Sequence, residues 1–475
     1  MANSDNVTGR NYFSWFWRLL MTVGVPNWLK EFARRYREHP AELYLVGGAL
    51  RDQILGQDPK EWDMATSLKP SETEKLLKSL GAQNIGTIGR QFGTITAQIE
   101  NHRVEITTFR GESYSSDSRK PEVNWGTDIN EDLARRDFTI NAIAYDFVRD
   151  RLIDPHSGQL DLNHKVIRAV GNPLDRFDED PLRMLRALRF AAVLGFSIDQ
   201  ETYNAVIARR ERLAIVSSER IAEELNRALL SPQPSRFVRL SVESALVAYF
   251  LPELIPTIDL EFDPAEHKDI YEHILAVLDK TEPKLELRWC ALLHDIAKPL
   301  TRKKNGGLYS FHGHENVGAK IAQQVLRRLK YPNSFVDYVA KLVRLHQRLP
   351  NYNGDWSDGA IRRFVREAGE TLDDLFSFAE ADVTGSNLKK IASYRQNRQA
   401  LRERIDELEH QAQIAKITSP LDGNELMAIF KRPAGPWLGE VKKYLLDLVL
   451  DGKLKQANKK TATELARKYL LKKQK

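Results

Sequence analysis

The densest chemical signal in the sequence is Gly47-Gly48-Ala49-Leu50-Arg51-Asp52, with Glu61-Trp62-Asp63 following nine residues later. The apolar run from Leu43 to Val46 predicts a strand that ends at the glycine pair. Glycines at such a turn let the backbone approach a phosphate, and a helix that begins there points free N–H groups at it. Because Arg51 adds a cation, Gly48 and Arg51 are candidate nucleotide-binding residues. The alternative is an ordinary strand-to-helix turn.

Two carboxylates follow this turn. Glu61 and Asp63 stand at i and i+2, and alternate residues of a strand share one face, so both can hold Mg²⁺ ions. Glu105 lies in another apolar run, Val104–Phe109, where a buried carboxylate is costly without a cation. Glu61, Asp63 and Glu105 are therefore the candidate catalytic residues. The alternative is a solvated strand edge.

A run of charges comes next, in Arg135-Arg136-Asp137-Phe138-Thr139-Ile140-Asn141-Ala142. Arginine offers a planar fork to phosphate oxygens, and aspartate accepts hydrogen bonds from ribose hydroxyls. Arg136, Asp137 and Asn141 are therefore candidate nucleotide-binding residues. A surface salt-bridge network is the alternative.

Helical periodicity begins after Asp178. Asp180 and Arg183 are three residues apart, which predicts that both stand on one face of a helix. Arg186 and Arg189 continue this basic helix, where they can order a triphosphate or an RNA end. For Asp180 and Arg183 the alternative is an intrahelical salt bridge.

The composition is that of a globular protein with a polyanionic partner. The 475 residues indicate two to four packed units, and the formal net charge is +6. The last 25 residues hold nine Lys or Arg against two acidic residues, which indicates RNA contact or a solvated helix end. The single cysteine, Cys290, suits a reducing compartment, so the cytoplasm is expected. The aromatic stretch Tyr12–Met21 contains Arg18 and predicts an amphipathic helix that packs on the body, not a membrane span.

Histidines and carboxylates gather between residues 266 and 385. The motifs are Glu272-His273, His294-Asp295-Ile296-Ala297-Lys298, His312-Gly313-His314-Glu315, His346 and Asp382. One histidine in an apolar helix is usually a packed core residue. Imidazoles and carboxylates together, however, suit a transition metal or Mg²⁺ that activates water.

Four motifs that lie before the histidine region resemble the class II tRNA nucleotidyltransferase and bacterial poly(A) polymerase family. The resemblance covers about residues 40–255. In the family's order they are Gly47–Asp52, the acidic pair before Ala65-Thr66, Arg135–Ala142 and Glu179-Asp180-Pro181-Leu182-Arg183. The resemblance implies a polymerase-β-like head, Mg²⁺ at the acidic pair and ribose selection by Arg136-Asp137. It also implies that Asp180 and Arg183 read the base of CTP or ATP, which suits a carboxylate acceptor and a guanidinium donor.

One position departs from the family pattern. Glu61 stands where the family usually has Asp, and its extra methylene moves the carboxylate outward by about 1.5 Å. Either the backbone compensates for this difference or the activity falls.

The histidine region resembles the HD phosphohydrolase superfamily. The resemblance implies a basic metal set of His273, His294, Asp295 and Asp382. His314 and His346 are further candidates, and Ni²⁺, Co²⁺ or Mn²⁺ is the expected ion. The implied activity is hydrolysis of phosphomonoesters or cyclic phosphodiesters, such as damaged RNA ends. The alternative is a structural HD fold without activity.

A polar loop, Gly111–Pro121, bears on the reaction. In the resembling family a loop here supports the switch to adding A, and enzymes restricted to CC addition lack it. The expectation is therefore addition of CMP and AMP, from CTP and ATP, to the 3′ end of tRNA. A-only addition and poly(A) synthesis are the close alternatives. The alternative of another class, motivated by Glu61, is an RNA-end phosphohydrolase with a non-catalytic RNA-binding head.

The predicted fold class is α+β: a nucleotidyltransferase head of mixed sheet and helices, then an all-α neck, an HD domain and a helical tail. Strands are also expected at Thr94–Glu100 and Val104–Phe109, a helix at Tyr394–Gln413, and Pro436 in a first helical turn. The expected parts are an N-terminal helical extension (1–38), the head (39–175), a base- and RNA-binding neck (176–260), the HD domain (261–385) and a tRNA-binding tail (386–475). No membrane partner is expected, and the oligomeric state stays open.

Overall fold

The computed structural model describes residues 24–113, 122–126, 128–263, 268–305, 308–383, 388–412 and 417–473. The chain forms two compact units, Met1–Arg220 with Arg239–Tyr249, and Ile221–Val238 with Phe250–Lys475. The stretch Tyr12–Met21, for which the sequence predicts an amphipathic helix, lies outside the described residues. None of the described helices has both the length and the apolar composition that a membrane crossing needs.

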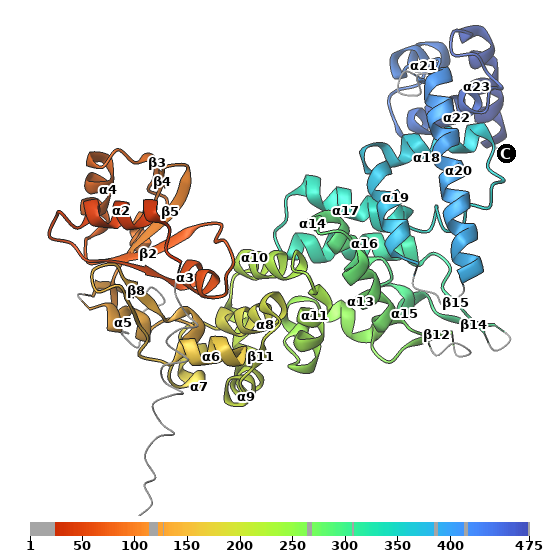
Figure 1. Cartoon of the computed structure of the whole chain (residues 1–475). Helices are drawn as coiled ribbons and strands as arrows, with labels where there is room; N and C mark the ends of the chain where they lie inside the picture. The colour runs from red at the N-terminus through yellow and green to blue at the C-terminus, as the bar shows by residue number, and fades with distance from the viewer. Residues whose placement is uncertain are drawn as a thin grey trace, which may run out of the picture. The chain divides into compact units, whose positions relative to one another are not determined.

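A seven-stranded mixed sheet forms the centre of the first unit, in the order β3-β4-β5-β2-β1-β8-β9 (Figure 1). The strands are β1 (Leu43–Val46), β2 (Trp62–Thr66), β3 (Gln83–Gly86), β4 (Thr94–Ile99), β5 (His102–Thr108), β8 (Ala144–Asp146) and β9 (Arg151–Ile153). Strands β2 and β5 are parallel, and the other neighbours are antiparallel. The three predicted strands are confirmed, with bounds that differ by at most two residues.

Strand β1 explains why the sequence shows a continuous apolar run before the glycine pair. All four of its residues are buried, so both faces of the strand are covered and alternation is lost. One core cluster of this unit contains Tyr44, Val46, Ala65, Phe109, Ile129, Leu133, Ala142, Ala144 and Val170. The strand therefore fixes the position of the turn that follows it.

Helices surround this sheet and continue beyond it. They are α2 (Asn27–Tyr36), α3 (Gly47–Ile54), α4 (Pro70–Ser79), α5 (Ile129–Ala134), α6 (Gly158–His164), α7 (Pro173–Glu179), α8 (Leu182–Leu194) and α9 (Gln200–Arg209). Helix α3 contacts β1 and β2, whereas α4 contacts β3, β4 and β5. Two short strands, β6 (Arg110–Ser113) and β7 (Glu122–Trp125), form an antiparallel pair. The first three residues of the predicted polar loop, Gly111–Ser113, therefore belong to β6, and its residues 114–121 lie outside the described part.

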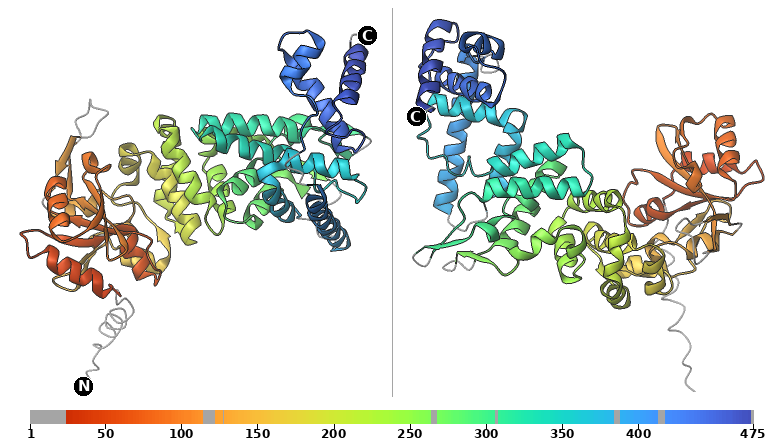
Figure 2. Two further views of the ribbon diagram at one scale, coloured as in Figure 1. Left: turned by 90° about the horizontal axis from the view of Figure 1, so that it is seen from above. Right: turned by 180° about the vertical axis from the view of Figure 1, so that it is seen from behind.

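The rest of the chain is helical apart from short strand pairs, which confirms the α+β prediction. Its helices are α10 (Ser218–Leu229), α11 (Pro234–Glu243), α12 (Val247–Phe250), α13 (Ile270–Lys280), α14 (Leu285–Leu293), α15 (Lys298–Thr301), α16 (His314–Arg328), α17 (Asn333–Leu345), α18 (Asp358–Ala368), α19 (Leu372–Ala381), α20 (Leu388–Ala412), α21 (Gly423–Phe430), α22 (Pro436–Leu450) and α23 (Lys459–Lys473). The last three gather into a small bundle, dark blue in Figure 2, with its own core.

Two local predictions in this region hold. Pro436 is the first residue of α22, where its missing N–H costs nothing. The helix predicted at Tyr394–Gln413 lies within α20 except for Gln413, which is outside the described residues. The five-part division of the chain stays a prediction.

One glycine sets the distance between α6 and the single-turn helix η2 (Thr139–Asn141). A Cβ atom on Gly158 would lie 2.1 Å from the carbonyl oxygen of Thr139 and 2.8 Å from Cγ1 of Ile143. Both neighbours are buried, so neither can move aside cheaply. Gly158 therefore allows the close packing that holds η2, and with it Asn141, in place.

Gly158→Ala is expected to destabilise the first unit by about 3 kcal/mol or more, because backbone has to shift to admit the methyl group. The measurement is urea unfolding, followed by a probe in whichever unit carries the substitution. The matched control is Gly439→Ala in α22, where a Cβ meets nothing within 4 Å. That change should be neutral or stabilising by up to about 1 kcal/mol. Equal effects of the two substitutions would contradict this packing.

Candidate functional site

Three carboxylates gather at one place on the sheet of the first unit. Asp63 on β2 and Glu105 on β5 stand opposite each other in the parallel pairing of these strands. Burial raises the pKa of the Asp63 carboxyl. Burial and the charges of Asp63 and Glu61 raise the pKa of Glu105. The three groups feel one another's negative charge, which is the electrostatic condition for a cation site.

Glu61 stands beside a basic residue. Strand β2 begins at Trp62, so Glu61 immediately precedes the strand that carries Asp63. Its carboxylate lies 3.1 Å from the Arg103 guanidinium and is 44% exposed. Within the described ranges, three donor atoms lie within 4.8 Å of one another only in the second unit, so the carboxylates around Asp63 are more widely spaced. Mutual repulsion and the pull of Arg103 account for this spacing.

The glycine turn lies directly against this acidic group. Gly47 has a φ of 66°, in the region that favours glycine, and opens α3. A Cβ atom there would lie 3.0 Å from Nη1 of Arg136 and 3.4 Å from Oδ2 of Asp63. The Ala49 N–H donates to the same Asp63 oxygen over 3.4 Å. The turn thus brings the start of a helix, a carboxylate and a guanidinium together.

A buried hydrogen-bond chain joins the other predicted nucleotide-binding residues. Arg51 donates to Oδ1 of Asn141 over 2.8 Å, and the Asn141 amide donates to Asp137 over 3.1 Å. Arg186 pairs with the same Asp137 at 2.6 Å. Burial alone would raise the pKa of Asp137, but Arg186 and the hydrogen bonds outweigh it and lower that pKa to about 2. Asp137 is therefore a fixed anion between two polar partners.

Asp132 also belongs to this network, although it is not among the residues predicted from the sequence motifs. Its side chain is 1% exposed and pairs with Arg135 at 2.7 Å and Arg136 at 2.9 Å. Burial opposes the charge, but the two arginines outweigh it and lower the pKa of Asp132. The signal for it was present in the sequence, since residues three and four apart on a helix face each other.

The predicted helical face shared by Asp180 and Arg183 is wrong. Asp180 has φ −142° and ψ 99°, an extended conformation between α7 and α8. Pro181 causes this, because a proline disfavours the helical conformation of the residue before it. Asp180 pairs with Arg220 at 2.7 Å, and Arg183 pairs with Glu179 at 2.7 Å. The alternative of a salt bridge between Asp180 and Arg183 is therefore not what the structure contains.

Three arginines surround one aromatic ring on α8. The guanidinium carbons of Arg51, Arg186 and Arg189 lie 5.2, 5.5 and 4.0 Å from the centroid of Phe190. Phe190 is buried, so these cation–π contacts are protected from water. The ring holds three of the predicted cations in one cluster.

The predicted ligands of the histidine region also come together. They are His273 in α13, His294 and Asp295 after α14, His314 at the start of α16, His346 after α17 and Asp382 after α19. Nε2 of His273 lies 3.1 Å from Asp382 and 3.2 Å from Nε2 of His294. Nε2 of His314 lies 3.3 Å from Nε2 of His346.

The orientation of three of these rings follows one local rule. Each Nδ1 lies within hydrogen-bond distance of the carbonyl oxygen three residues earlier: His294 to Ala291 at 2.9 Å, His314 to Phe311 at 2.8 Å and His346 to Val343 at 2.6 Å. With Nδ1–H donating, each Nε2 keeps its lone pair. These lone pairs converge, as in metal sites whose ligands are oriented by backbone carbonyls.

Asp295 belongs to two donor groups. One combines it with His273 and His294, and the other with His314 and His346. Its side chain is 1% exposed, and neither carboxylate oxygen accepts a well-aligned hydrogen bond. Lys298 forms an ion pair with it at 2.6 Å. A buried carboxylate with open acceptor positions among imidazoles fits one or two transition-metal ions.

The protonation states of three of these four groups suit metal binding. Burial, together with the charge of His294, lowers the pKa of His346 to about 3. Burial opposes a charge on His294, but Asp295 and Asp382 outweigh it and raise the pKa of His294. Burial would also raise the pKa values of both aspartates, but the neighbouring histidines hold them below the usual range. Neutral His346 and two anionic aspartates are the forms that bind metal.

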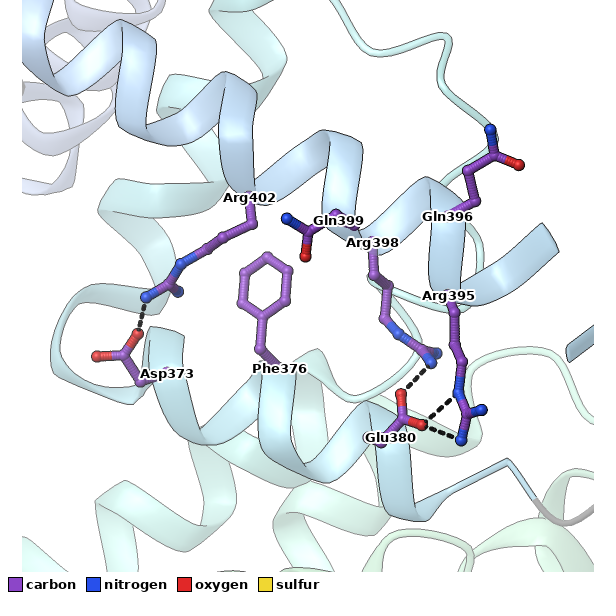
Figure 3. A pocket seen from close by; sticks show the side chains of 8 residues that line it. All are labelled: Asp373, Phe376, Glu380, Arg395, Gln396, Arg398, Gln399 and Arg402. Atoms are coloured by element: carbon purple, nitrogen blue, oxygen red, sulfur yellow. Dashed lines mark hydrogen bonds and ion pairs between the residues drawn. The ribbon is translucent and has the colours of Figure 1, made fainter. Parts of the chain in front are cut away.

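The second unit also contains a polar pocket of ≈ 630 Å³ between α19 and α20 (Figure 3). Its arginines already have partners. Arg395 and Arg398 pair with Glu380 at 2.5 and 2.6 Å. Arg402 pairs with Asp373 at 2.5 Å. Since each guanidinium meets a carboxylate, the pocket is best explained as an ion-pair network that joins two helices.

Comparison with known families divides the chain into three matched regions. Residues 43–168 match the Poly A polymerase head domain, and residues 195–257 match the family described as the probable RNA and SrmB-binding site of polymerase A. Residues 270–418 match the HD domain. The acidic group and the histidine cluster thus fall in different matched regions.

Curated relatives cover most of the chain. It is 32% identical to the CCA-adding enzyme of Geobacillus sp. (strain WCH70), over 88% of this chain and 91% of the relative. It is 34% identical to the A-adding tRNA nucleotidyltransferase of Deinococcus radiodurans, over 86% of this chain and 91% of the relative. The fold is similar to that of the Bacillus stearothermophilus CCA-adding enzyme in complex with CTP, with a TM-score of 0.63 and 24% identity over 94% of this chain and 98% of that one.

Asp63→Asn is expected to stabilise the first unit at pH 7 without divalent cations. The pKa of Asp63 in the folded state is raised above its ordinary value of 3.8, so folding opposes the charged form. The folded state therefore loses stability as the pH rises from 3.8 through the raised pKa. Removing the charge restores it. The measurement is the unfolding midpoint at pH 7, with and without Mg²⁺.

The matched control is Asp132→Asn, at a buried carboxylate whose pKa is lowered. Its stabilising charge is present above the ordinary pKa, so this substitution should lower the same midpoint. A lower midpoint for Asp63→Asn in metal-free buffer would contradict the electrostatic account of the acidic group.

Proposed function

Because the chain belongs to the family of class II tRNA nucleotidyltransferases and bacterial poly(A) polymerases with an HD domain, we propose that it adds CMP and AMP to the 3′ end of tRNA. CTP and ATP are the donors, and no nucleic-acid template is needed. The observation that carries this proposal is the Gly47–Gly48 turn, which lies against Asp63 and Arg136. A triphosphate seated on that turn would meet backbone N–H groups and two kinds of charge at once.

Each part of the head has a proposed role. Glu61, Asp63 and Glu105 would hold Mg²⁺, which activates the attacking tRNA hydroxyl and stabilises the leaving pyrophosphate. Gly48 and Arg51 would bind the triphosphate. The sugar would be bound by Asp137 and Asn141, which the buried hydrogen-bond chain holds in place, and by Arg136, which pairs with Asp132. Arg186 and Arg189 would add positive charge beside the phosphates.

Base choice would involve an exchange of partners. Asp180 now pairs with Arg220, and Arg183 with Glu179. A cytosine or adenine could offer its exocyclic amine to Asp180 and its ring acceptor to Arg183. The Asp180 carboxylate is 30% exposed, so the exchange needs no unfolding of a core. Guanine and uracil present the opposite polarity at these positions and would be disfavoured.

The extent of addition is a further part of the proposal. Full CCA addition is favoured by the polar loop between β6 and β7 and by the likeness to CCA-adding relatives over most of their length. A-only addition is the second candidate, favoured by the 34% identity to an A-adding enzyme. We place the reaction in the cytoplasm, and we assign tRNA contact to the basic tail.

Purified protein is expected to extend tRNAs that end before CCA, after C and after CC, when CTP and ATP are supplied, and to stop at CCA. Asp63→Asn should lower incorporation by about 100-fold or more, because the site loses a charge that holds the cation. The measurement is incorporation of labelled CMP and AMP, resolved by length.

Each other outcome of that assay has a distinct meaning. Addition of A alone, and only to tRNA that ends in CC, would indicate an A-adding enzyme. Long A tails would indicate a poly(A) polymerase. No incorporation into any substrate removes nucleotidyl transfer and leaves the RNA-end phosphohydrolase with a non-catalytic head. That second class is motivated by Glu61 and its pairing with Arg103.

For the histidine cluster we propose a metal-dependent phosphohydrolase with Ni²⁺, Co²⁺ or Mn²⁺. The basic ligands would be His273, His294, Asp295 and Asp382, with His314 and His346 completing a second position. Bound metal would supply a hydroxide near neutral pH. The chain's own residues hold the ring tautomers and exclude bulk water.

Asp295→Asn is expected to reduce bound Mn²⁺ in dialysed protein to near zero, because both donor groups share this residue. The measurement is metal content by atomic emission. The matched control is Asp374→Asn, at a buried carboxylate that pairs with Lys284 and Tyr338 outside the cluster. Metal content should be unchanged there. Wild-type metal content in Asp295→Asn would disprove the shared-ligand arrangement.

A further inference from the structure

The beginnings of β2 and β5, two strands that lie side by side in the sheet of the first unit, bring four charged side chains together (Figure 1). Asp63 stands opposite Glu105 in the parallel register, and Arg103 precedes Glu105 by two residues. Alternate residues of a strand share a face, so Arg103 lies on the same face as Glu105. Oε1 of Glu61 lies 3.1 Å from Nη1 of Arg103. A guanidinium therefore stands beside the acidic group of the head.

Aromatic contacts hold the same two strand ends in place. Trp28 of α2 stacks on His102, with ring centroids 4.2 Å apart and an interplanar angle of 2°. The same indole meets Trp62 edge-on, at 5.4 Å. The two residues that it contacts are the chain neighbours of Arg103 and Glu61, so the rings fix the backbone from which the ion pair extends. The distance between the two charged groups is thus set by the lengths of their side chains.

The length of the glutamate decides whether this pair can form. A side chain shorter by one methylene would withdraw the carboxylate by about 1.5 Å. The separation of 3.1 Å would then grow to roughly 4.6 Å, which is beyond hydrogen-bond distance. The length of Glu61 and the position of Arg103 therefore form one arrangement.

Arg103 and Arg136 both adjoin the acidic group, but they are anchored differently. Arg136 is held by the buried Asp132 at 2.9 Å. Within the ranges that the structure describes, Arg103 has no carboxylate other than Glu61 within 4.0 Å, and its side chain is 63% exposed. An ion pair as exposed as this adds little to the stability of the fold. The main effect of the pair is therefore on where the Glu61 carboxylate lies.

This arrangement opposes the binding of a free cation. Among the described residues, the carboxylates of Glu61, Asp63 and Glu105 do not form a group whose ligand atoms lie within 4.8 Å of one another. For Glu61 to join the other two, either its pair with Arg103 breaks or the cation is held close to the guanidinium charge. Both events cost binding free energy, so the guanidinium lowers the affinity of the acidic group for a divalent ion.

We propose that Arg103 is a positioning residue of the head, which draws Glu61 away from Asp63 and Glu105 and so weakens the binding of a free divalent cation. This inference rests on the proposed cation site of the head and names a residue that controls its occupancy. Arg103 acts through Glu61 and is not itself a ligand. The effect therefore depends on both side chains, and it is lost when the guanidinium is removed or when Glu61 is shortened.

The test is equilibrium dialysis of the full-length protein against Mn²⁺ without nucleotide. All variants carry Asp295→Asn, which is expected to abolish binding at the histidine cluster. Asp63→Asn in this background gives the level of binding that does not involve the head. Above that level, Arg103→Gln should bind Mn²⁺ about threefold more tightly, because the competing guanidinium is gone. Arg103→Lys keeps the charge and should stay near the parent affinity.

A double-mutant cycle shows whether Arg103 acts through Glu61. Glu61→Asp keeps the negative charge but shortens the side chain, so Arg103→Gln in that background should change the affinity by less than about 1.5-fold. The matched control is Arg90→Gln, at an exposed arginine that pairs with Glu74 at 3.2 Å, and it should change nothing. Equal effects of Arg103→Gln in both Glu61 backgrounds would show that the guanidinium acts by its charge alone, which overturns the positioning role.

Nucleotide incorporation separates this inference from the proposed function. If the wild type incorporates CMP and AMP but Arg103→Gln leaves Mn²⁺ affinity unchanged, the transferase stands and the positioning role is wrong. If incorporation is absent but the affinity shift appears and depends on Glu61, the positioning role stands and the transferase proposal fails. Binding that never exceeds the Asp63→Asn level in any variant removes the cation site of the head and this inference with it.

A folding defect is kept apart from these outcomes by two features of the design. Because the ion pair is exposed, Arg103→Gln should leave the unfolding temperature nearly unchanged. The cycle compares the same substitution in two Glu61 backgrounds, so a loss of folded protein that is common to both cancels.

Discussion

The main constraint in the head is the close approach of charged side chains to the glycine turn, where a Cβ atom would be crowded at Gly47. At Gly47 such an atom would meet the Arg136 guanidinium at 3.0 Å, and at Gly48 it would meet Asp63 at 3.4 Å. The side chains that reach the turn are held from behind, as Asp132 holds Arg136. Strand β2 brings Asp63 to this point, and α5 carries the buried Asp132 that holds Arg136 there.

Much of the structure of the head could be predicted from the sequence, because the patterns that indicate its strands, turn and helix are local. The apolar run Leu43–Val46 gives a buried strand, the glycine pair gives a turn into a helix, and the parallel register of β2 and β5 brings Asp63 to Glu105. The spacing within a strand or helix fixes which neighbours share a face. Such features need no knowledge of distant parts of the chain.

The sequence predictions fail at two kinds of position. At one kind, a stronger backbone preference overrides the residue spacing. At the other, the partner of a charged residue is distant in the sequence. Pro181 forces Asp180 out of the helix that the spacing predicts. The partner of Asp180 is Arg220, forty residues away, and no spacing rule reveals such a pair. The same holds for Glu61, whose carboxylate turns toward Arg103 on the neighbouring strand. Residue type and order therefore indicated the site, but not which ion pairs hold its members in this state.

The two candidate metal centres differ in the ligand atoms that they offer. The head offers only carboxylate oxygens, whose mutual repulsion keeps them spread and suits a hard, weakly held ion such as Mg²⁺. The histidine cluster presents imidazole lone pairs already aimed by backbone carbonyls, so softer transition metals gain more there. The two centres therefore differ in their donor atoms: one presents carboxylate oxygens, and the other presents imidazole nitrogens together with carboxylates.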